Sequence, residues 1–402
     1  MFGSHLSIAG GMHLALEQSA KLGLDAVQVF TKNQQQWAAP ALTEEAVAAW
    51  SAALRQRGWH AGAPPEPGED TARDRVVSHA SYLINLASPT PELREKSIAL
   101  LREEIERCER LAIPLLVFHP GSPVSDPREV GVERIAAHAS ALIIATRGYR
   151  TTLCLENVVG GGQTVGRTFE ELADLRGRII AATGAPERIG FCIDTCHAHA
   201  AGYDLSTRAG SAAVLEQALS VLGEAAIRVL HVNDSKAPAG SRLDRHAHIG
   251  EGTIGVEGFG PWVAAPALAR VPKIMETPKG TTKAGEDFDT INVARLRDAA
   301  AGRAMTIVAL TEVVIKAPTV KKDVAKKSDA PQSQRAGAAK QSATEPRARA
   351  EDHASGTPKR VTPKRGTAER AGKTVVSKKT ARAGKPAAKV RKGKARAQPK
   401  KG

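Results

Sequence analysis

Short apolar runs alternate along residues 1–300 with longer stretches of helical periodicity. Eight of the runs have the length and composition of β-strands, at residues 2–7, 26–30, 75–79, 115–119, 152–156, 190–194, 228–233 and 271–276. Most of them are followed by alanine- and leucine-rich sequence in which apolar residues recur every three or four positions, as in residues 43–58 and 92–111. This alternation predicts a parallel sheet whose strands are connected by crossover helices.

The number of runs and the length of chain that they occupy favour an α/β fold of the (β/α)₈ or TIM-barrel class over residues 1–302. A doubly wound open sheet remains the alternative, although no G-x-G-x-x-G turn follows the first run. Residues 303–315 form an apolar connector that we expect to dock on the barrel. Residues 61–74, rich in proline, glycine and acidic side chains, are expected to form a surface loop without chemistry of its own.

Charge is distributed unevenly along the chain. The whole sequence carries a formal net charge of +15, but residues 316–402 alone contain 26 Lys and Arg against 6 Asp and Glu, and no aromatic residue. Such a segment buries too little apolar surface to fold, so we expect a disordered basic C-terminal tail. Residues 1–315 carry 31 basic and 36 acidic side chains. The positive charge that nucleic-acid-binding proteins need therefore belongs mainly to the tail.

The four cysteines are too few and too scattered for a disulfide framework, which favours a reducing compartment. The first residues lack the basic and apolar segments of a signal peptide, and no window approaches the roughly 20 apolar residues of a membrane span. We therefore expect a cytoplasmic protein with no membrane partner, associated with the nucleoid if the source is bacterial.

Six of the eight apolar runs end on or near a histidine or a carboxylate. These residues are His79, His119, Glu156, Asp194, His231 and Glu276. In a (β/α)₈ barrel the active site lies at the carboxyl ends of the strands, so the six side chains are predicted to converge on one rim. One histidine or acid at a strand end is commonly a hydrogen-bonding residue. Six on one rim indicate a functional site.

Spacing adds three further candidates. His197 follows Asp194 by three residues, and Asp244 and His246 lie two apart, so that both share a face in an extended segment. Five histidines and four carboxylates exceed the three or four ligands of one zinc ion, which predicts two or three ions and a bridging carboxylate. This donor set suits Zn²⁺, and also Mn²⁺ or Fe²⁺, better than Mg²⁺.

Clustered divalent ions lower the pKa of a bound water and neutralise the charge that develops on phosphodiester oxygens, so phosphate ester hydrolysis is the favoured reaction. Isomerisation or epimerisation of a sugar by one or two metals and a general base is the alternative. A thiolate zinc site at Cys192 and Cys196 is disfavoured because the sequence lacks a second cysteine pair. His199 and His248 are expected to support ligands, and His5 to contact substrate.

Long motifs in residues 1–300 resemble the endonuclease IV family, the zinc-dependent apurinic/apyrimidinic endonucleases of base excision repair. The motifs are HLSIAGG, FTKNQQQW, SHASYLINLASP, FHPGS, LENVVGGG, CIDTCHAHAAGYD, HVNDSK, GSRLDRHAHIGEG and METP, in the order of the family. The resemblance implies a hydrolase that cleaves duplex DNA 5′ to an abasic site, leaving a 3′-hydroxyl and a 5′-deoxyribose phosphate, and that trims blocked 3′ ends. A DNA-compacting protein with a vestigial barrel is disfavoured by the complete set of ligands.

The resemblance also implies three zinc ions per chain, with Mn²⁺ as a substitute at one site. The first zinc would be held by His79, His119 and Glu156, the second by Glu156, Asp194, His231 and Glu276, and the third by His197, Asp244 and His246. Glu156 would also be the catalytic residue that orients the attacking water.

DNA contacts are implied for Tyr82 and Leu83, which match wedge positions, and for Lys32 at the rim. Gln35 stands where the best-known members of the family carry arginine, so the grip on DNA at this point is expected to lack a charge. The expected partner is duplex DNA with abasic sites or blocked 3′ ends, bound by a monomer. The tail is expected to add DNA affinity without sequence preference.

Overall fold

The computed structural model describes residues 1–59 and 72–310 of the chain. The chain divides into two units, Met1–Lys321 and Lys322–Gly402, and the second lies outside the described residues. The tail that was predicted to be disordered is therefore not among the described residues. The same holds for residues 311–315 of the predicted connector and residues 61–71 of the predicted loop.

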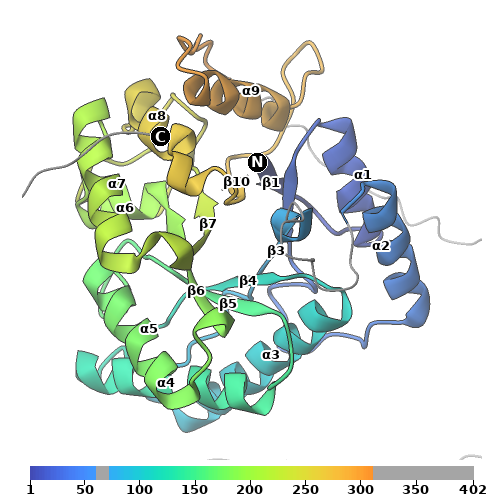
Figure 1. Cartoon of the computed structure of the whole chain (residues 1–402), viewed down its shortest axis with the longest axis vertical. Coiled ribbons are helices and arrows are strands. Elements are labelled where there is room, and N and C mark those ends of the chain that lie inside the picture. The colour runs from blue at the N-terminus through green and yellow to red at the C-terminus, as the bar shows by residue number, and fades with distance from the viewer. Residues whose placement is uncertain (60–71, 311–402) are drawn as a thin grey trace, which may run out of the picture. The chain divides into compact units, whose positions relative to one another are not determined.

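Eight parallel strands close into a barrel, which confirms the predicted (β/α)₈ fold (Figure 1). Each of the eight apolar runs corresponds to a strand of the barrel. The strands start within two residues of the predicted starts, and they end at the predicted ends or up to two residues earlier. They are β1 Phe2–His5, β2 Ala26–Val29, β3 Val76–His79, β4 Leu115–Phe118, β5 Thr152–Glu156, β6 Ile189–Asp194, β7 Ile227–His231 and β10 Lys273–Met275. The sheet closes because β1 pairs in parallel with both β2 and β10. The open-sheet alternative is therefore wrong.

Helices surround the barrel as an outer ring in Figure 1. They are α1 His13–Lys21, α2 Glu44–Gln56, α3 Pro91–Arg110, α4 Arg128–Ala145, α5 Phe169–Thr183, α6 Thr195–Ala201, α7 Arg208–Leu222, α8 Gly255–Ala264 and α9 Phe288–Ala300. Four short 3₁₀ helices, Ala72–Arg75, Pro186–Arg188, Glu224–Ala226 and Pro266–Leu268, precede strands. Several helix starts are set by local sequence, as at α5, where Thr168 and Glu171 form a reciprocal capping box.

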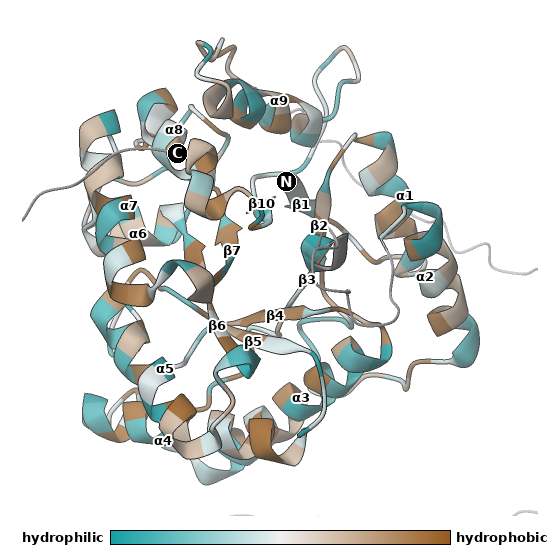
Figure 2. Ribbon diagram, in the orientation of Figure 1, coloured by the Kyte–Doolittle hydropathy of each residue, from teal (hydrophilic) through white to brown (hydrophobic). Residues whose placement is uncertain are grey.

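The barrel has two apolar regions. Its interior holds small and branched side chains from seven of its strands, namely Ala26, Val77, Leu115, Val117, Cys154, Cys192, Val229 and Ile274. A larger core fills the space between the strands and the helices, and includes Trp50, Phe169 and Trp262. Figure 2 accordingly shows hydrophobic strands such as β4 and β7 at the centre and mixed hydropathy along the surrounding helices. The interior is thus packed, and polar chemistry is confined to the barrel ends.

A long loop follows β7 and carries a small antiparallel pair, β8 Asp234–Ser235 and β9 His246–Ala247. The buried Asp234 carboxylate accepts hydrogen bonds from the N–H groups of Ser235, Gly250, Gly252, Ile254 and Gly255. Gly252 is required here, because a Cβ at this residue would lie 2.4 Å from the Asp234 carboxylate. The Asp234 carboxylate therefore fixes residues 250–255, which end the loop; Asp244 and His246 belong to the same loop. We call residues 232–254 the β7 loop.

The chain from residue 303 to residue 310 docks on the barrel. Arg295 of α9 donates to the carbonyl of Val308 and to the carboxylate of Glu251, and Glu251 accepts from the N–H of Leu310. Since Glu251 belongs to the β7 loop, the last described residue lies beside that loop.

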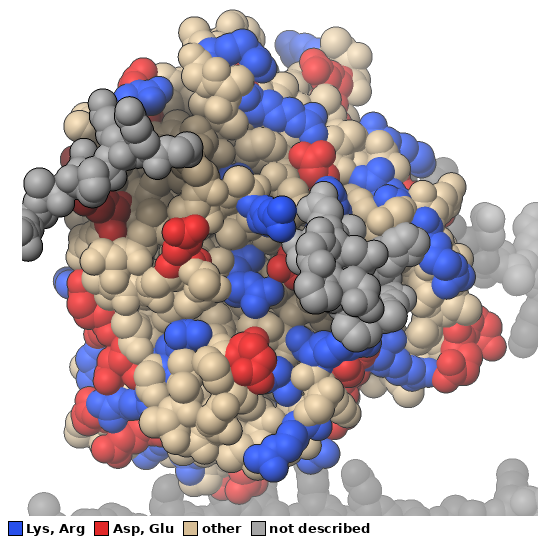
Figure 3. Space-filling view, in the orientation of Figure 1, with Lys and Arg blue, Asp and Glu red and all other residues tan. Residues whose placement is uncertain are grey.

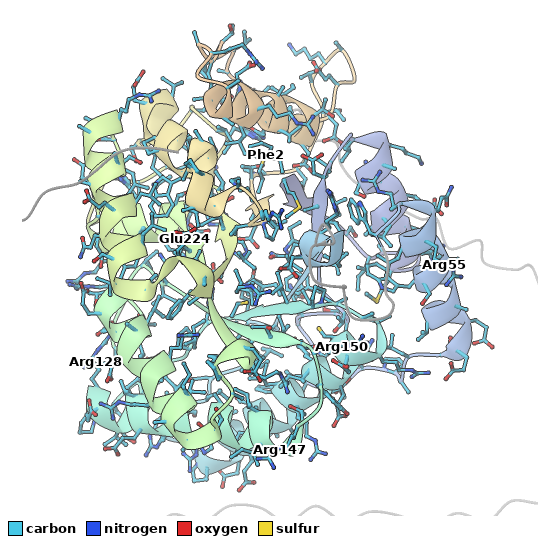
Figure 4. The ribbon with its side chains drawn as sticks, viewed as in Figure 1. Phe2, Arg55, Arg128, Arg147, Arg150 and Glu224 are labelled. Atoms are coloured by element: carbon cyan, nitrogen blue, oxygen red, sulfur yellow. The ribbon has the colours of Figure 1, made fainter. Side chains whose placement is uncertain are left out.

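The barrel end at which the strands begin lies opposite the rim where the candidate ligands lie, and it carries charges of both signs. Figure 4 labels Phe2, Arg150 and Glu224 around the centre of the ring, each within a few residues of the start of β1, β5 or β7. In Figure 3, Lys and Arg are interspersed with Asp and Glu, so the visible part of this face offers no broad basic surface for DNA. No helix among residues 1–59 and 72–310 combines the length and apolar character needed to cross a membrane.

Candidate metal centre

The nine residues selected for metal binding converge where the strands end. Among the described residues, every group of His, Cys, Asp and Glu with donor atoms close enough to share an ion lies in this region. Three of these groups contain only the predicted residues: His79 with His119 and Glu156; Glu156 with Asp194, His231 and Glu276; and Asp194 with His197 and His246. Neighbouring groups share a carboxylate, as a multinuclear centre requires.

Glu156, the last residue of β5, lies at the middle of this cluster. Its Oε2 lies 3.1 Å from Nε2 of His79 and 3.1 Å from Nε2 of His119. Its Oε1 lies 2.9 Å from Nδ1 of His231 and 3.4 Å from Nδ1 of His197. The side chain is fully buried. Each oxygen therefore faces a different set of imidazoles, which is the arrangement of a carboxylate that bridges two ions.

Asp244 lies between two histidines at the outer edge of the cluster. Its Oδ2 is 3.2 Å from Nε2 of His197, and its Oδ1 is 3.2 Å from Nε2 of His246. Asp194 also approaches His246, at 3.7 Å. The region of the expected third zinc thus contains Asp194 as well as the three residues assigned to it by resemblance.

Four histidines are held by a hydrogen bond on one ring nitrogen. The Nδ1 atoms of His79, His197 and His246 donate to the carbonyls of Ala80, Asn157 and Glu276, respectively. Nε2 of His231 lies 2.8 Å from Oε1 of Gln28. A donor on one ring nitrogen fixes the tautomer and leaves the lone pair of the other nitrogen free for a metal. The Nε2 atom of His246 is buried and lies 3.2 Å from Oδ1 of Asp244.

The carboxylates and imidazoles of the cluster shift one another's pKa values. Burial alone would raise the pKa of Glu156, but His231 and His119 hold that pKa well below its ordinary value. Burial lowers the pKa of His231, but Glu276 and Glu156 raise it to about 9. In the same way Asp244 raises the pKa of His246 to about 9 against the effect of burial. A divalent cation replaces the protons of such imidazoles, so the donor set fits zinc.

Three amide side chains orient the candidate ligands, and the sequence analysis missed them. Gln28 donates to Glu276 at 2.6 Å and accepts from His231. Asn157 exchanges two hydrogen bonds with the backbone of Asp194, and Asn233 donates to the Asp194 carboxylate at 2.7 Å. Each carried a signal, since Gln28 interrupts an apolar run and the two asparagines lie one or two residues beyond a strand-end ligand.

His5, His199 and Cys192 lie near the candidate ligands but are not among the nine. Nδ1 of His5 lies 3.3 Å from Glu276, and its Nε2 is buried without a hydrogen-bond partner. His199 accepts from the N–H of Leu205 and lies 3.2 Å from the hydroxyl of Thr253. The Cys192 thiol lies among the apolar side chains inside the barrel, and burial raises its pKa well above the ordinary value. This location weakens the thiolate alternative.

The expected DNA contacts fall into two classes. Tyr82 is 60% exposed, and its ring packs on Phe30, His79 and His119 at centroid distances of 5.2–6.0 Å. Gln35 is exposed, and Leu83 is half-buried against the core. Lys32 is only 4% exposed, and its ammonium donates to the carbonyls of Asn33 and Gln36. The structure therefore corrects the expectation for Lys32, because its charge is used within its own loop.

The barrel and its rim of imidazoles and carboxylates define the class of protein. The family model described as "Xylose isomerase-like TIM barrel" matches residues 16–294. Within this class, a D-tagatose 3-epimerase-like protein of known structure shows the same fold, with a TM-score of 0.51, 19% identity, and coverage of 75% of this chain and 97% of the other. At this identity the likeness concerns the fold alone.

Closer relatives define the family. A probable endonuclease 4 of Geobacter sulfurreducens is 41% identical over 295 residues, which are 73% of this chain and 93% of the relative. The crystal structure of endonuclease IV from Thermus thermophilus aligns with a TM-score of 0.61 and 35% identity, covering 75% of this chain and 99% of the other. The chain belongs to the endonuclease IV family, which confirms the resemblance seen in the motifs.

Proposed function

We propose that this protein is a DNA repair endonuclease that hydrolyses the phosphodiester 5′ to abasic sites in duplex DNA. The reaction leaves a 3′-hydroxyl and a 5′-deoxyribose phosphate, and the same site trims blocked 3′ ends. The observation that carries the proposal is the position of Glu156, whose two oxygens face the imidazoles of different ligand groups. Membership of the endonuclease IV family supports it.

Three zinc ions per chain suit the donor set, with manganese as a substitute at one site. His79, His119 and Glu156 would hold the first ion; Glu156, Asp194, His231 and Glu276 the second; and His197, Asp244 and His246 the third, with Asp194 close enough to contribute. Such ions supply Lewis acidity toward a water and toward the oxygens of the scissile phosphate.

The side chains of the protein then have separate tasks. Glu156 is the catalytic carboxylate, because a buried anion at the centre of the cluster can accept a hydrogen bond from the attacking water and orient it. Gln28, Asn157 and Asn233 hold the ligands in place through the hydrogen bonds described above. Tyr82 and Leu83 enter the minor groove as wedges, and Gln35 contacts the opened duplex through its amide.

The tail is assigned a supporting role. Residues 316–402 contain 26 Lys and Arg against 6 Asp and Glu, so they contact DNA phosphates without sequence preference. The docked residues 303–310 support this role, because they bring the chain to the β7 loop before the tail begins.

A direct test uses the purified full-length chain, a duplex with one abasic site and a matched intact duplex. We expect cleavage of the abasic duplex alone, without added Mg²⁺, and about three zinc ions per chain by elemental analysis. Slow loss of activity on prolonged chelation, restored by zinc, is also expected. An uncut abasic duplex together with interconversion of an aldose and a ketose would support the isomerase alternative instead.

A further inference from the structure

Two rim segments that carry the proposed DNA contacts lie side by side. The Gln35 loop, residues 30–43, connects β2 to α2, and the Tyr82 segment, residues 80–90, connects β3 to α3. The rings of Phe30 and Tyr82 meet edge to face with centroids 5.8 Å apart. The Ser81 hydroxyl donates to the carbonyl of Gln34 at 2.6 Å. Two segments separated in sequence by α2 and β3 are thus joined next to the residues that would face DNA.

Helix α3 lies behind this junction and supplies a buried carboxyl group to it. Both carboxylate oxygens of Glu104 accept from the backbone N–H of Ser81, at 3.1 and 3.2 Å. Glu104 is 1% exposed, and Ser81 is 4% exposed. The residue after Ser81 is Tyr82, so this pair of hydrogen bonds fixes the backbone immediately before the proposed wedge.

The same helix also fixes the Gln35 loop. The guanidinium of Arg107, one turn after Glu104, donates to the carbonyls of Thr31 and Pro40 at 2.6–3.1 Å. Within the loop the buried Lys32 ammonium donates to the carbonyls of Asn33 and Gln36, which flank Gln35. Since residues three apart on a helix share a face, one turn of α3 holds both segments.

A wedge that opens a duplex has to work against base stacking. A loop that moved freely would lose part of its interaction with DNA to ordering entropy. We propose that Glu104, through Ser81, is a positioning residue that holds the Tyr82 segment and the Gln35 loop as one rigid unit for opening the duplex at the lesion. This inference rests on the proposed function and extends it to residues that touch neither metal nor DNA.

The experiment compares two substrates that differ only in the need for opening. One is a fully paired duplex with an abasic site, and the other carries the same site inside an unpaired bubble. Glu104→Gln keeps the shape of the side chain and one acceptor oxygen, but it replaces the second oxygen with an NH₂ group that cannot accept from the Ser81 N–H. Ser81→Ala removes the hydroxyl that donates to the carbonyl of Gln34 and accepts from the N–H of Leu83, and it leaves the backbone N–H that meets Glu104 in place. The matched control is Glu106→Gln, two residues along α3, where the side chain is exposed and pairs with Arg102 on the same helix.

We expect Glu104→Gln to lower kcat/KM on the paired duplex about tenfold or more and on the bubble less than about threefold, with unchanged zinc content. Ser81→Ala should show the same preference to a smaller degree, and it provides the test if Glu104→Gln does not fold. Glu106→Gln should match the wild type on both substrates. Equal losses on the two substrates, or no loss on either, would overturn the inference while leaving the proposed function intact. A wild-type protein that cuts neither substrate would overturn the proposed function and the inference with it.

Discussion

The carboxylate of Glu156 lies 2.9 Å from the Nδ1 of His231, and both side chains are fully buried. Two ionisable groups are placed together out of water only where each compensates the charge of the other or where both bind a cation. The remaining ring nitrogen of His231 lies against Gln28, so this histidine has no other place for an ion than the side that faces Glu156. The pair therefore marks the centre of the proposed site.

Glu156→Gln should abolish catalysis with little change in fold. The amide has the same shape but neither the charge nor the lone pairs to serve two ligand groups, so we expect kcat on an abasic duplex to fall about a thousandfold or more. Rates and zinc content should be measured beside Glu133→Gln, an exposed position on α4. Activity within about tenfold of the wild type would contradict the catalytic role of Glu156.

Gln28→Leu should weaken metal binding without touching a ligand. The substitution removes the acceptor for Nε2 of His231 and the donor to Glu276. Loss of such support lowers metal affinity or activity by about 10- to 100-fold in comparable sites. Competition with a chromogenic chelator measures the affinity directly. Gln217→Leu, an exposed position on α7, is the control, and equal affinities in the two variants would refute the role of Gln28.

The buried carboxyl of Glu104 predicts a pH dependence of stability. Burial raises its pKa from 4.5 to about 7 in the folded protein. Between these two values the folded chain binds more protons than the unfolded chain, so the contribution of Glu104 to stability falls as the pH rises. The free energy of unfolding of Glu104→Gln, minus that of the wild type, should therefore increase by up to roughly 3 kcal/mol between about pH 5 and about pH 7.5.

Denaturant unfolding at several pH values measures this difference. Glu106→Gln, at an exposed position of the same helix, is the matched control. A constant difference for Glu104→Gln would show that its carboxyl titrates near the ordinary value. We expect Glu104→Gln to become more stable relative to the wild type as the pH rises, and yet to cleave the paired duplex poorly. A loss of activity without a loss of stability separates a positioning role from a purely structural one.

Truncation separates the docked connector from the basic tail. A chain that ends at residue 310 keeps the contacts of Val308 and Leu310 with Arg295 and Glu251, whereas a chain that ends at residue 302 loses them. We expect the shorter chain to be less stable by about 1–2 kcal/mol, since buried groups lose hydrogen bonds. Both truncations should flatten the dependence of DNA affinity on salt, because each phosphate contact contributes about −0.9 to the slope of log K against log salt. An unchanged slope would show that the tail does not bind DNA.

Most of the fold and the nine candidate ligands could be predicted from sequence. The eight strands are short runs of β-branched and apolar residues, and parallel strands in a barrel bring their last residues to one rim, so Glu156 and Asp194 could be placed together without coordinates. Asp244 and His246 were accessible through their spacing alone.

Residues whose role depends on tertiary contacts could not be predicted. Lysine is seldom buried, so nothing local in the sequence indicated that Lys32 would turn inward to the carbonyls of its own loop. In the sequence, Glu104 is one of several acidic residues on an amphipathic helix. Only the structure shows that its carboxylate accepts a hydrogen bond from the N–H of Ser81. The pair β8 and β9 has two residues per strand, which is too short for a periodicity to show.

The Asp234 carboxylate, with its five backbone donors, has a consequence for how the site acquires metal. The β7 loop is held through Asp234, Gly252 and Glu251, and none of these side chains belongs to the nine candidate ligands. Zinc that binds to such a preorganised loop does not have to order it, so little of the binding energy is consumed by folding. On the proposed function, the metal would displace protons from the imidazoles of a loop that is already ordered, so we expect metal affinity to fall as the pH is lowered.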